Sequence, residues 1–357
     1  MAPGPRRCRS VPAVADHARS TRRRWWGWGL GLAGLCVALA AVDLLVGPGG
    51  IQWGDAPRLL ALDPDSRFGQ IVLQLRLPRV AAAVVAGSAL ALAGLVLQNN
   101  LGNPLASPYT LGISQAAAFG AAFAIIGLGV YQPRAELLLP PGQILAVSAF
   151  VAASLAMGAI AALLMLARLG PHAVVLAGVG LGSLFQSATM LLQYFGTDVD
   201  VAATLFWTFG DLAKAGWPEV ATMALPTAVA LGYFLARRWD YNALTWGDEV
   251  AASLGTRVTR LRVLTLALAS LISAVVTAFL GIIGFVGLIA PHLARLVVGD
   301  DYRALVALSA LTGAALLLAA DLVARTALAP VTLPVGIVTA FLGVPLFLFL
   351  LVRSARP

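Results

Sequence analysis

The stretch LRLPRVAAAVVAGSALALAGLVLQNN at residues 75–100 decides the fold of this chain. Its first part carries two arginines around a proline, and its last part carries three consecutive amides. The apolar run between them is about as long as the 20 residues that a helix needs to cross a lipid bilayer. Lipid offers backbone groups no hydrogen-bond partner, so a spanning segment must be helical. The stretch therefore predicts a membrane helix with positive charge at one end and a polar break at the other.

The composition extends this prediction to the whole chain. Of its 357 residues, 60% are hydrophobic and 11% are charged, whereas about a quarter of the residues of a soluble domain are charged. We therefore expect an all-α, polytopic membrane protein of about ten helices. The apolar segments lie at residues 25–46, 80–98, 109–130, 142–167, 173–195, 218–236, 263–284, 286–298, 305–324 and 332–352. The eighth of them is too short to span a bilayer alone.

The placement of arginine predicts the orientation. Cytoplasmic loops near membrane ends are enriched in positive residues, and three arginines at residues 22–24 precede the first segment. Ten crossings then place both termini and the loop at residues 239–262 in the cytoplasm. The net charge of +8 is explained by these helix ends, so we expect no nucleic acid as a partner.

The N-terminal residues 1–24 are polar and rich in arginine. We expect them to form a poorly ordered cytoplasmic tail, and residues 25–357 to form a single transmembrane domain. A cleaved signal peptide is the alternative. The apolar run of about 22 residues is longer than a typical signal-peptide core, which favours an uncleaved helix.

The sequence excludes ATP hydrolysis by the P-loop route. Lys214 is its only lysine and is followed by Ala215, so the phosphate-binding loop GxxxxGK[ST] is absent. The three histidines are scattered, and Cys8 and Cys36 do not have the spacing of a metal site. We expect a translocation subunit that is not an enzyme and that binds neither a metal nor a cofactor itself.

Acidic residues within the predicted membrane helices are few. A carrier driven by protons or sodium usually keeps such residues at mid-membrane depth. Asp43 lies at the outer end of the first segment, and Asp321 lies four residues before Arg325, a spacing that predicts an ion pair. An ATP-independent secondary transporter stays the less favoured alternative, and uphill transport would draw its energy from another subunit.

The loop at residues 239–262 is the longest predicted cytoplasmic connection. Asp248 and Glu249 suit the positive N-terminal end of a short helix, and Gly255 can end that helix. By itself the pattern is typical either of a helix that docks in a partner's groove or of an ordinary solvated loop helix.

Five motifs occur in order along the chain: LRLPR at 75–79, NPLA at 103–106, LAGV at 176–179, GFVGLIAPH at 284–292 and LPVGIVT at 333–339. In this series the chain resembles the FecCD family, the permease subunits of ABC importers for iron chelates, haem and cobalamin. The resemblance covers about residues 75–351 and implies a fold like that of the cobalamin-importer permease. It implies as cargo an iron chelate, siderophore or haem, with cobalamin or another metal chelate as the alternative.

The resemblance also implies partners. These are a second permease copy or a close paralogue, two cytoplasmic ATP-binding subunits that hold ATP and magnesium, and an external substrate-binding protein.

Residue roles follow from the same resemblance. Family positions that receive glutamates of the binding protein match Arg76, Arg79 and Arg325. Alternatively, the first two only extend to the membrane interface and the third serves only Asp321. The segment that matches the ATPase-coupling region comprises Gly247, Asp248, Glu249, Ala251, Ala252, Leu254 and Gly255. Candidates for the translocation path are Gln98, Asn99, Asn100, His172 and Gln186, although the three consecutive amides could instead cap a helix end.

Overall fold

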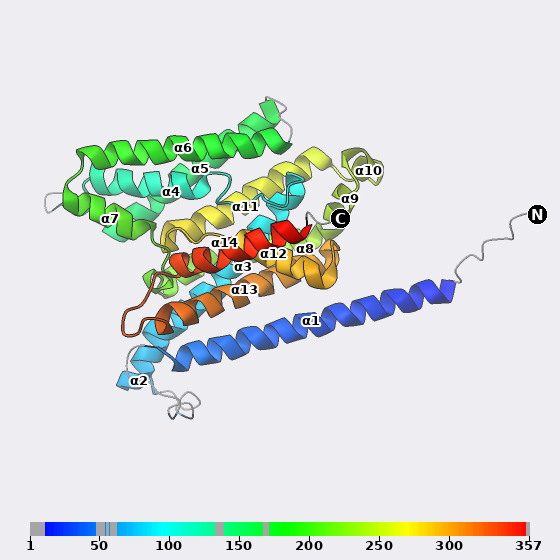
Figure 1. Cartoon of the computed structure of the whole chain (residues 1–357), viewed down its shortest axis with the longest axis horizontal. Helices are drawn as coiled ribbons and strands as arrows, with labels where there is room; N and C mark the ends of the chain where they lie inside the picture. Colours follow the sequence, from blue (N-terminus) through cyan, green and yellow to red (C-terminus); the bar gives the residue numbers. More distant parts are fainter. Residues whose placement is uncertain are drawn as a thin grey trace, which may run out of the picture.

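A computed structural model describes residues 11–47, 54, 57, 63–132, 139–166 and 171–354. These residues form a bundle of helices (Figure 1) and, within the described part, no strand beyond one isolated bridge between Phe209 and Ile282. The long helices are α1 (Val11–Leu45), α3 (Leu77–Asn100), α5 (Pro141–Leu166), α6 (Pro171–Phe195), α8 (Trp217–Ala236), α11 (Val258–Leu280), α13 (Tyr302–Thr326) and α14 (Val335–Ser354). The shorter elements are α2 (Arg67–Gln70), η2 (Ile71–Arg76), α4 (Ile113–Ala122), η3 (Phe123–Gly127), α7 (Asp198–Thr208), η4 (Leu212–Lys214), α9 (Arg238–Leu244), α10 (Asp248–Ser253) and α12 (Val286–Val298).

Each predicted apolar segment coincides with a helix, which confirms the all-α membrane class. Among the described residues, 7 helices are long and apolar enough to cross a membrane. The third, eighth and tenth segments hold shorter apolar helices, Ile113–Gly127, Val286–Val298 and Val335–Phe349. The shortness expected of the eighth segment is thus confirmed. The number of complete crossings and the cytoplasmic side of the termini stay predictions.

Two helix starts differ from the expected boundaries. Helix α1 begins at Val11, so residues 11–24 of the expected irregular tail are helical, and residues 1–10 lie outside the described part. The helical run of α3 begins at Arg67, because the π-helix η2 precedes it without a break. Pro78 lies near the start of α3 but inside this continuous helical run, and it has no N–H to donate to the preceding turn. The carbonyl of Leu73 in that turn accepts from the indole N–H of Trp217 at 2.9 Å. The motif LRLPR therefore lies inside a long helix and not at its start.

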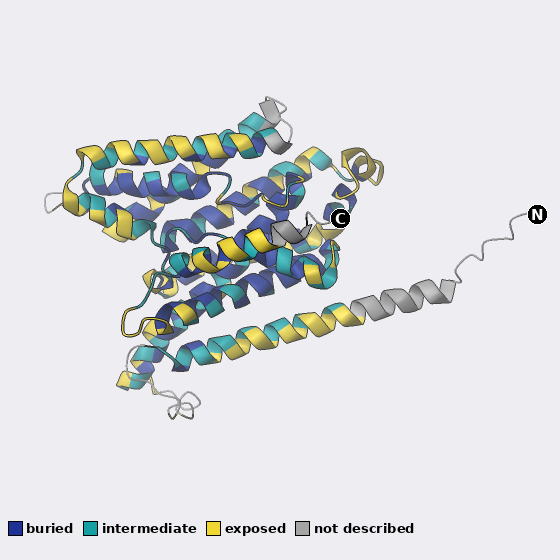
Figure 2. Ribbon diagram, in the orientation of Figure 1, coloured by how far each residue is buried: buried dark blue, intermediate teal, exposed yellow. Residues whose placement is uncertain are grey.

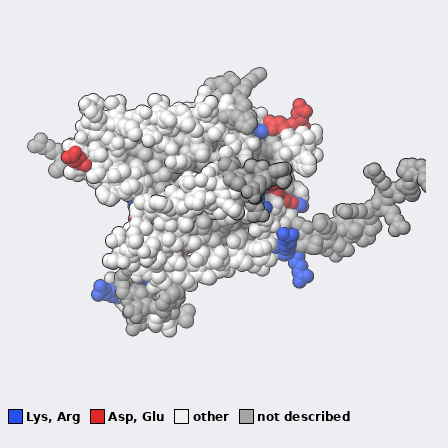
Figure 3. Space-filling model, viewed as in Figure 1, with Lys and Arg blue, Asp and Glu red and all other residues white. Residues whose placement is uncertain are grey.

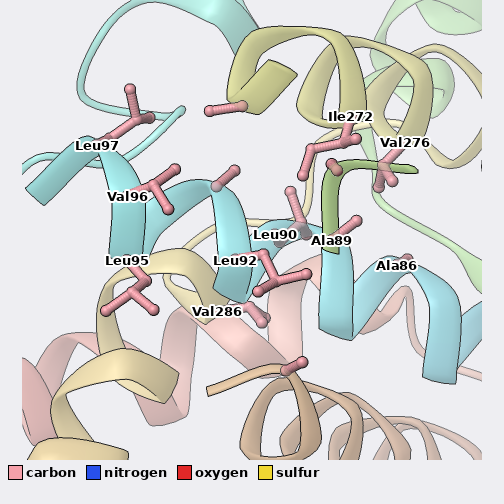
Figure 4. Close-up of a cluster of buried hydrophobic side chains, with 14 of the residues drawn as sticks. Ala86, Ala89, Leu90, Leu92, Leu95, Val96, Leu97, Ile272, Val276 and Val286 are labelled. Carbon is pink, nitrogen blue, oxygen red and sulfur yellow. The ribbon is translucent and has the colours of Figure 1, made fainter. Parts of the chain in front are cut away.

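Helix α3 forms the centre of the core and is buried along most of its length (Figure 2). Figure 4 shows Leu90 and Leu92 of α3 among Ile272 and Val276 of α11 and Val286 of α12. The apolar sequence of α3 thus packs against other helices, whereas α1 and α6 expose much of their surface (Figure 2).

Glycines allow α3 to approach its neighbours closely. A Cβ atom built on Gly87 would lie 2.3 Å from the carbonyl oxygen of Gly313 in α13, and one built on Gly94 would lie 1.6 Å from that of Gly287 in α12. No side chain fits at either contact. Small residues that bring helix backbones together are a usual device of membrane proteins.

Charged side chains lie at the two ends of the bundle. On the face in Figure 3 they leave a broad uncharged surface between them, as a membrane crossing requires. Helices α9 and α10 lie at one end, together with the start of α1 and the end of α14, and α2 and α7 lie at the other end (Figure 1). Both ends of the described chain are therefore on the same side of the bundle.

Candidate functional site

A cleft of about 530 Å³ opens between α4, α6 and α14, beside the ends of α7 and α11. Gln186, one of the predicted path residues, lines it. Its lining contains amides, hydroxyls and aromatic rings and, among these described residues, no charged group. The full set is Tyr109, Gln115, Ala118, Gln186, Thr189, Met190, Gln193, Thr208, Phe209, Gly210, Ile282, Gly336, Ile337, Ala340 and Phe341.

Helix α6 supplies the polar wall of this cleft. Gln186, Thr189 and Gln193 are spaced by three and four residues, so they share one helix face. On the opposite wall, the side-chain oxygen of Gln115 is buried and accepts no hydrogen bond from the described residues. It is thus a vacant acceptor beside the cleft. Sequence analysis missed Gln115 and Gln193. The spacing of Gln193 from Gln186 on one helix face could have identified Gln193. No pattern in the sequence near Gln115 could have identified that residue.

The two walls are held close together. Gly112, with φ +78°, begins α4, and a Cβ atom built on it would lie 2.9 Å from the carbonyl oxygen of Gly178 in α6. The left-handed backbone and the close contact both favour glycine at this position.

The three consecutive amides at the end of α3 do not line the cleft. Gln98 donates to the carbonyl of Gly287 at 3.5 Å and accepts from Arg295 at 2.5 Å. Asn99 donates to the carbonyl of Tyr241 at 3.4 Å, and Asn100 donates to that of Arg262 at 3.0 Å. They therefore join the end of α3 to α12, α9 and α11.

His172 stands in the first turn of α6, at the end of the bundle that carries α9 and α10 (Figure 1). Its side chain lies outside the part of the chain whose side chains are described.

The predicted helix in the cytoplasmic loop is α10. It begins after Gly247, with Asp248 and Glu249 in its first turn, and it ends before Gly255, whose φ is +89°. The N–H of Gly255 donates to the carbonyl of Ala252 at 2.9 Å, so the helix start and the glycine stop are both confirmed.

Helix α10 presents an apolar surface. Ala251 packs inward with 0% exposure, whereas Leu254 is 70% exposed and Val250 is 44% exposed. Trp246, just before the helix, is 78% exposed. Exposed apolar groups on a helix at a membrane protein's charged end are typical of a contact surface.

Arg262 at the start of α11 connects α10 to the central helix. It donates to Asp248 at 2.7 Å and to the carbonyl of Asn100 at 2.6 Å. Sequence analysis placed Arg262 only at the end of the predicted cytoplasmic loop, residues 239–262. Its two partners lie 14 and 162 positions away in the chain, and no local pattern joins them.

Helix α9 is fixed to the start of α13. Asn242 donates to Asp301 at 2.9 Å and accepts from the N–H of Tyr302 at 2.7 Å. Burial opposes the charged form of Asp301, but hydrogen bonds from Arg303 and Asn242 outweigh it and lower the pKa of the carboxyl. Helices α9 and α10 are thus attached to α3, α11 and α13.

The three predicted docking arginines lie at the opposite end of the bundle, and all three have partners within the chain. Arg79 donates to both carboxylate oxygens of Asp321, at 2.8 and 3.0 Å, and lies 3.5 Å from Asp211. Arg325 lies 3.1 Å from Asp321, which confirms the predicted ion pair, and it also binds Asp43.

Arg76 is the last residue of η2 and lies directly before α3. It donates to the carbonyls of Leu44 and Gly47 at 2.6 and 3.2 Å. Arg76 and Arg325 are each 5% exposed, so both are buried within this chain. The ion pairs form an ion cluster, defined by Asp43, Arg79, Asp211, Asp321 and Arg325, that joins α1, α3, α13 and the segment before η4.

The comparisons with known proteins agree with this architecture. The model of the FecCD transport family matches residues 35–353. The chain is 40% identical over 294 residues to the hemin transport system permease protein HmuU of Yersinia pestis, which covers 80% of this chain and 84% of the relative. It is 36% identical over 346 residues to the vitamin B12 import system permease protein BtuC of Vibrio cholerae, with 93% and 96% covered.

A solved structure described as an inward-facing conformation of a metal-chelate type ABC transporter also matches. Its TM-score is 0.78 at 30% sequence identity, and the match covers 91% of this chain and 98% of that chain. The chain is therefore a multi-pass inner-membrane permease of the ABC importer class, and it belongs to the FecCD transport family.

Proposed function

We propose that this permease moves an iron chelate, siderophore or haem, from an external substrate-binding protein across the inner membrane. The observation that carries the proposal is the cleft beside α6. Its volume of about 530 Å³ lies within the range of roughly 300–1,000 Å³ that is usual for sites of small organic molecules. The relative from Yersinia pestis is described as a hemin permease.

The lining of the cleft suits a chelate better than a bare inorganic anion. Recognition of a small anion calls for cationic donors, and the lining contains none. Amides, hydroxyls and the rings of Tyr109, Phe209 and Phe341 suit the organic exterior of a chelate. Weak contacts of this kind let cargo enter and leave. Cobalamin satisfies the same argument and is the alternative cargo.

A second permease copy, or a close paralogue, would complete the path. Helices α6 and α14 both border the cleft, and both expose large apolar side chains: Leu184, Leu191, Tyr194, Phe195, Phe341, Leu342 and Phe349. Exposed apolar groups on membrane helices face either lipid or another helix. Their continuity with the cleft supports a copy of the permease as the second wall.

The energy would come from two cytoplasmic ATP-binding subunits that dock on α10. Its exposed apolar face supports this role, and Arg262 gives it a direct connection to α3. An ATP-independent carrier is less well supported, because Asp43 and Asp321 are both bound to arginine and are not free for an ion relay.

Docking of the binding protein on the outer arginines stays a proposal. Arg79 has the most accessible side chain of the three, at 12%. A glutamate from outside would have to compete with Asp321 for its guanidinium. Bidentate pairing with carboxylates is a usual role of arginine, which supports Arg79 as the first of the three to engage a partner.

The test is ATP hydrolysis by the reconstituted importer. The permease, its ATPase and its binding protein are placed in lipid, and ferric siderophores, haem and cobalamin are supplied in parallel. Stimulation by a binding protein loaded with an iron chelate is the expected result. Stimulation by a binding protein loaded with cobalamin, and by no other, would identify cobalamin as the cargo in place of an iron chelate. Transport by the permease without any ATPase would reject the importer mechanism.

A further inference from the structure

A second, smaller cavity of about 210 Å³ lies beside the coupling segment. It is formed by the end of α8, the start of α9, the connection after α10 and the first turns of α11. Its lining residues are Tyr233, Arg237, Asp240, Gly255, Thr256, Arg257, Arg260, Leu261 and Leu264. It is separate from the cleft beside α6, because the two share no lining residue.

The charge of this cavity is unbalanced. It has three arginines and one acid, Asp240, and that acid already accepts from Arg237 at 3.3 Å and from Thr256 at 3.1 Å. Arg257 and Arg260 form no ion pair or hydrogen bond with the described residues through their side chains. Two exposed guanidinium groups thus border a small cavity without an anionic partner.

The walls change from charged to apolar over one helical turn. In α8, Tyr233 lies one turn before Arg237, and in α11, Leu264 lies one turn after Arg260. One turn is about 5.4 Å along the axis. Leu264 is 38% exposed, so an apolar surface continues from the arginines toward the membrane interior. This order of groups matches the boundary between phospholipid headgroups and acyl chains.

We propose that this cavity binds the phosphate group of an anionic phospholipid from the adjacent membrane leaflet, with the acyl chains along Leu264. Basic pockets between membrane helices attract anionic headgroups, and guanidinium groups pair with phosphate oxygens in bidentate geometry. The apolar wall beyond the arginines favours a lipid over an acidic residue of a partner protein. The bound lipid contacts Gly255 and Thr256, which directly follow the coupling helix, and so restrains α10 against α11.

The test measures lipid binding to the purified full-length permease. The probe is phosphatidylglycerol, titrated by native mass spectrometry, with phosphatidylcholine as the zwitterionic comparison. The variant combines Arg257→Gln and Arg260→Gln. Each basic residue near an anionic membrane contributes roughly a five-fold factor in affinity, so the pair should lose about 25-fold. Binding of phosphatidylcholine should not change.

Arg238→Gln is the matched control, because Arg238 is exposed at the start of α9 but does not line the cavity. It should bind phosphatidylglycerol as the original chain does. If the double variant does not fold, Arg257→Gln alone should lose about five-fold. Unchanged phosphatidylglycerol affinity in either folded variant would overturn the proposal.

Two further arms separate the possible ligands. Inorganic phosphate should displace phosphatidylglycerol only weakly; displacement at equal concentrations would identify soluble phosphate as the ligand and reject the lipid. In membranes of phosphatidylcholine alone, the double variant should still bind the ATPase normally. Loss of ATPase binding there would assign the cavity to the protein partner and overturn the proposal.

Discussion

Arg262 donates a hydrogen bond of 2.7 Å to Asp248, and this contact joins α10 to the core of the permease. The other terminal nitrogen of Arg262 donates to the carbonyl of Asn100, the last residue of α3. A displacement of α10 therefore acts directly on the end of the most deeply packed helix. Because α3 contacts α11, α12 and α13 without side-chain space at Gly87 and Gly94, it would transmit such a displacement as a rigid element.

The first prediction concerns this contact. Asp248→Asn should leave the fold almost intact, because an ion pair with one partner 58% exposed contributes at most about 1 kcal/mol to stability. It should nevertheless lower transport per ATP hydrolysed by about five-fold or more, the usual lower range of coupling between sites. The measurement compares cargo uptake with ATP hydrolysis in the same proteoliposomes.

Arg262→Gln should have at least the same effect, because it also removes the hydrogen bond to the carbonyl of Asn100. The double variant should be no worse than Arg262→Gln alone, because that variant has already lost the contact with Asp248. Arg238→Gln, an exposed arginine outside this contact, serves as the control and should transport normally. Strictly additive losses in the double variant would mean that Asp248 and Arg262 act separately.

The second prediction concerns packing. Gly94→Ala should destabilise the permease by about 3 kcal/mol or more, because the added Cβ would lie 1.6 Å from the carbonyl oxygen of Gly287 and the backbones must separate. Gly158→Ala, at a helical position with nothing within 4 Å, should be neutral or stabilising by up to about 1 kcal/mol. Thermal unfolding in detergent measures both. Equal melting temperatures for the two variants would contradict the close contact of α3 with α12.

The helices could be predicted from the sequence because apolar length is a local property. The segment at residues 286–298 coincides with α12, and α10 begins and ends at the expected acids and glycine. The start of the long helix at Arg67 was missed. Residues 67–79 contain three arginines and a proline, so they do not form a purely apolar run. The π-helix η2 within them has no sequence pattern that would predict it.

The site was harder to predict, since its contacts join residues far apart in the chain. Gln98, Asn99 and Asn100 could face a path or hold a helix end, and only the positions of Tyr241, Arg262 and Arg295 decide where their amides point. Gln186 was placed beside the path through the family resemblance. The opposite wall of the cleft, which contains Gln115, depends on how α4 packs against α6.

The third prediction concerns the cleft. Gln115→Leu should reduce transport, because it removes a vacant buried acceptor that a chelate's donor would use, and a buried hydrogen bond typically contributes about 1 kcal/mol. Gln186→Leu should also reduce transport, because it removes an exposed amide from the lining of the cleft. Both should assemble normally with the ATPase, since neither residue lies near α10.

The measurement is uptake at several cargo concentrations. Ser183→Ala is the control, because Ser183 is exposed on α6 and lies outside the cleft, and this variant should transport as before. Full uptake by both leucine variants would exclude the cleft from the path.

The fourth prediction separates stability from docking in the ion cluster. Arg325→Met should destabilise the chain by about 3–5 kcal/mol, because it leaves Asp43, with 0% exposure, as a buried charge without its arginine partner. Adding Asp43→Asn should restore part of this loss, since the uncompensated charge is removed with its partner. Thermal unfolding of the single and double variants measures the difference, and no recovery in the double variant would contradict the pairing of Asp43 with Arg325.

Arg79→Gln should behave differently from Arg325→Met, because Asp321 keeps Arg325 at 3.1 Å and so retains one positive partner. We expect a folded permease whose affinity for the binding protein is lower, since Arg79 is the most accessible of the three arginines. The measurement is binding-protein association in a pull-down, with thermal unfolding of the same preparation. Arg67→Gln is a control, because Arg67 is exposed at the same end of the bundle and should keep both properties. A stable Arg79→Gln variant with unchanged association would limit Arg79 to its structural role in the cluster, and the docking surface would then have to lie elsewhere at this end.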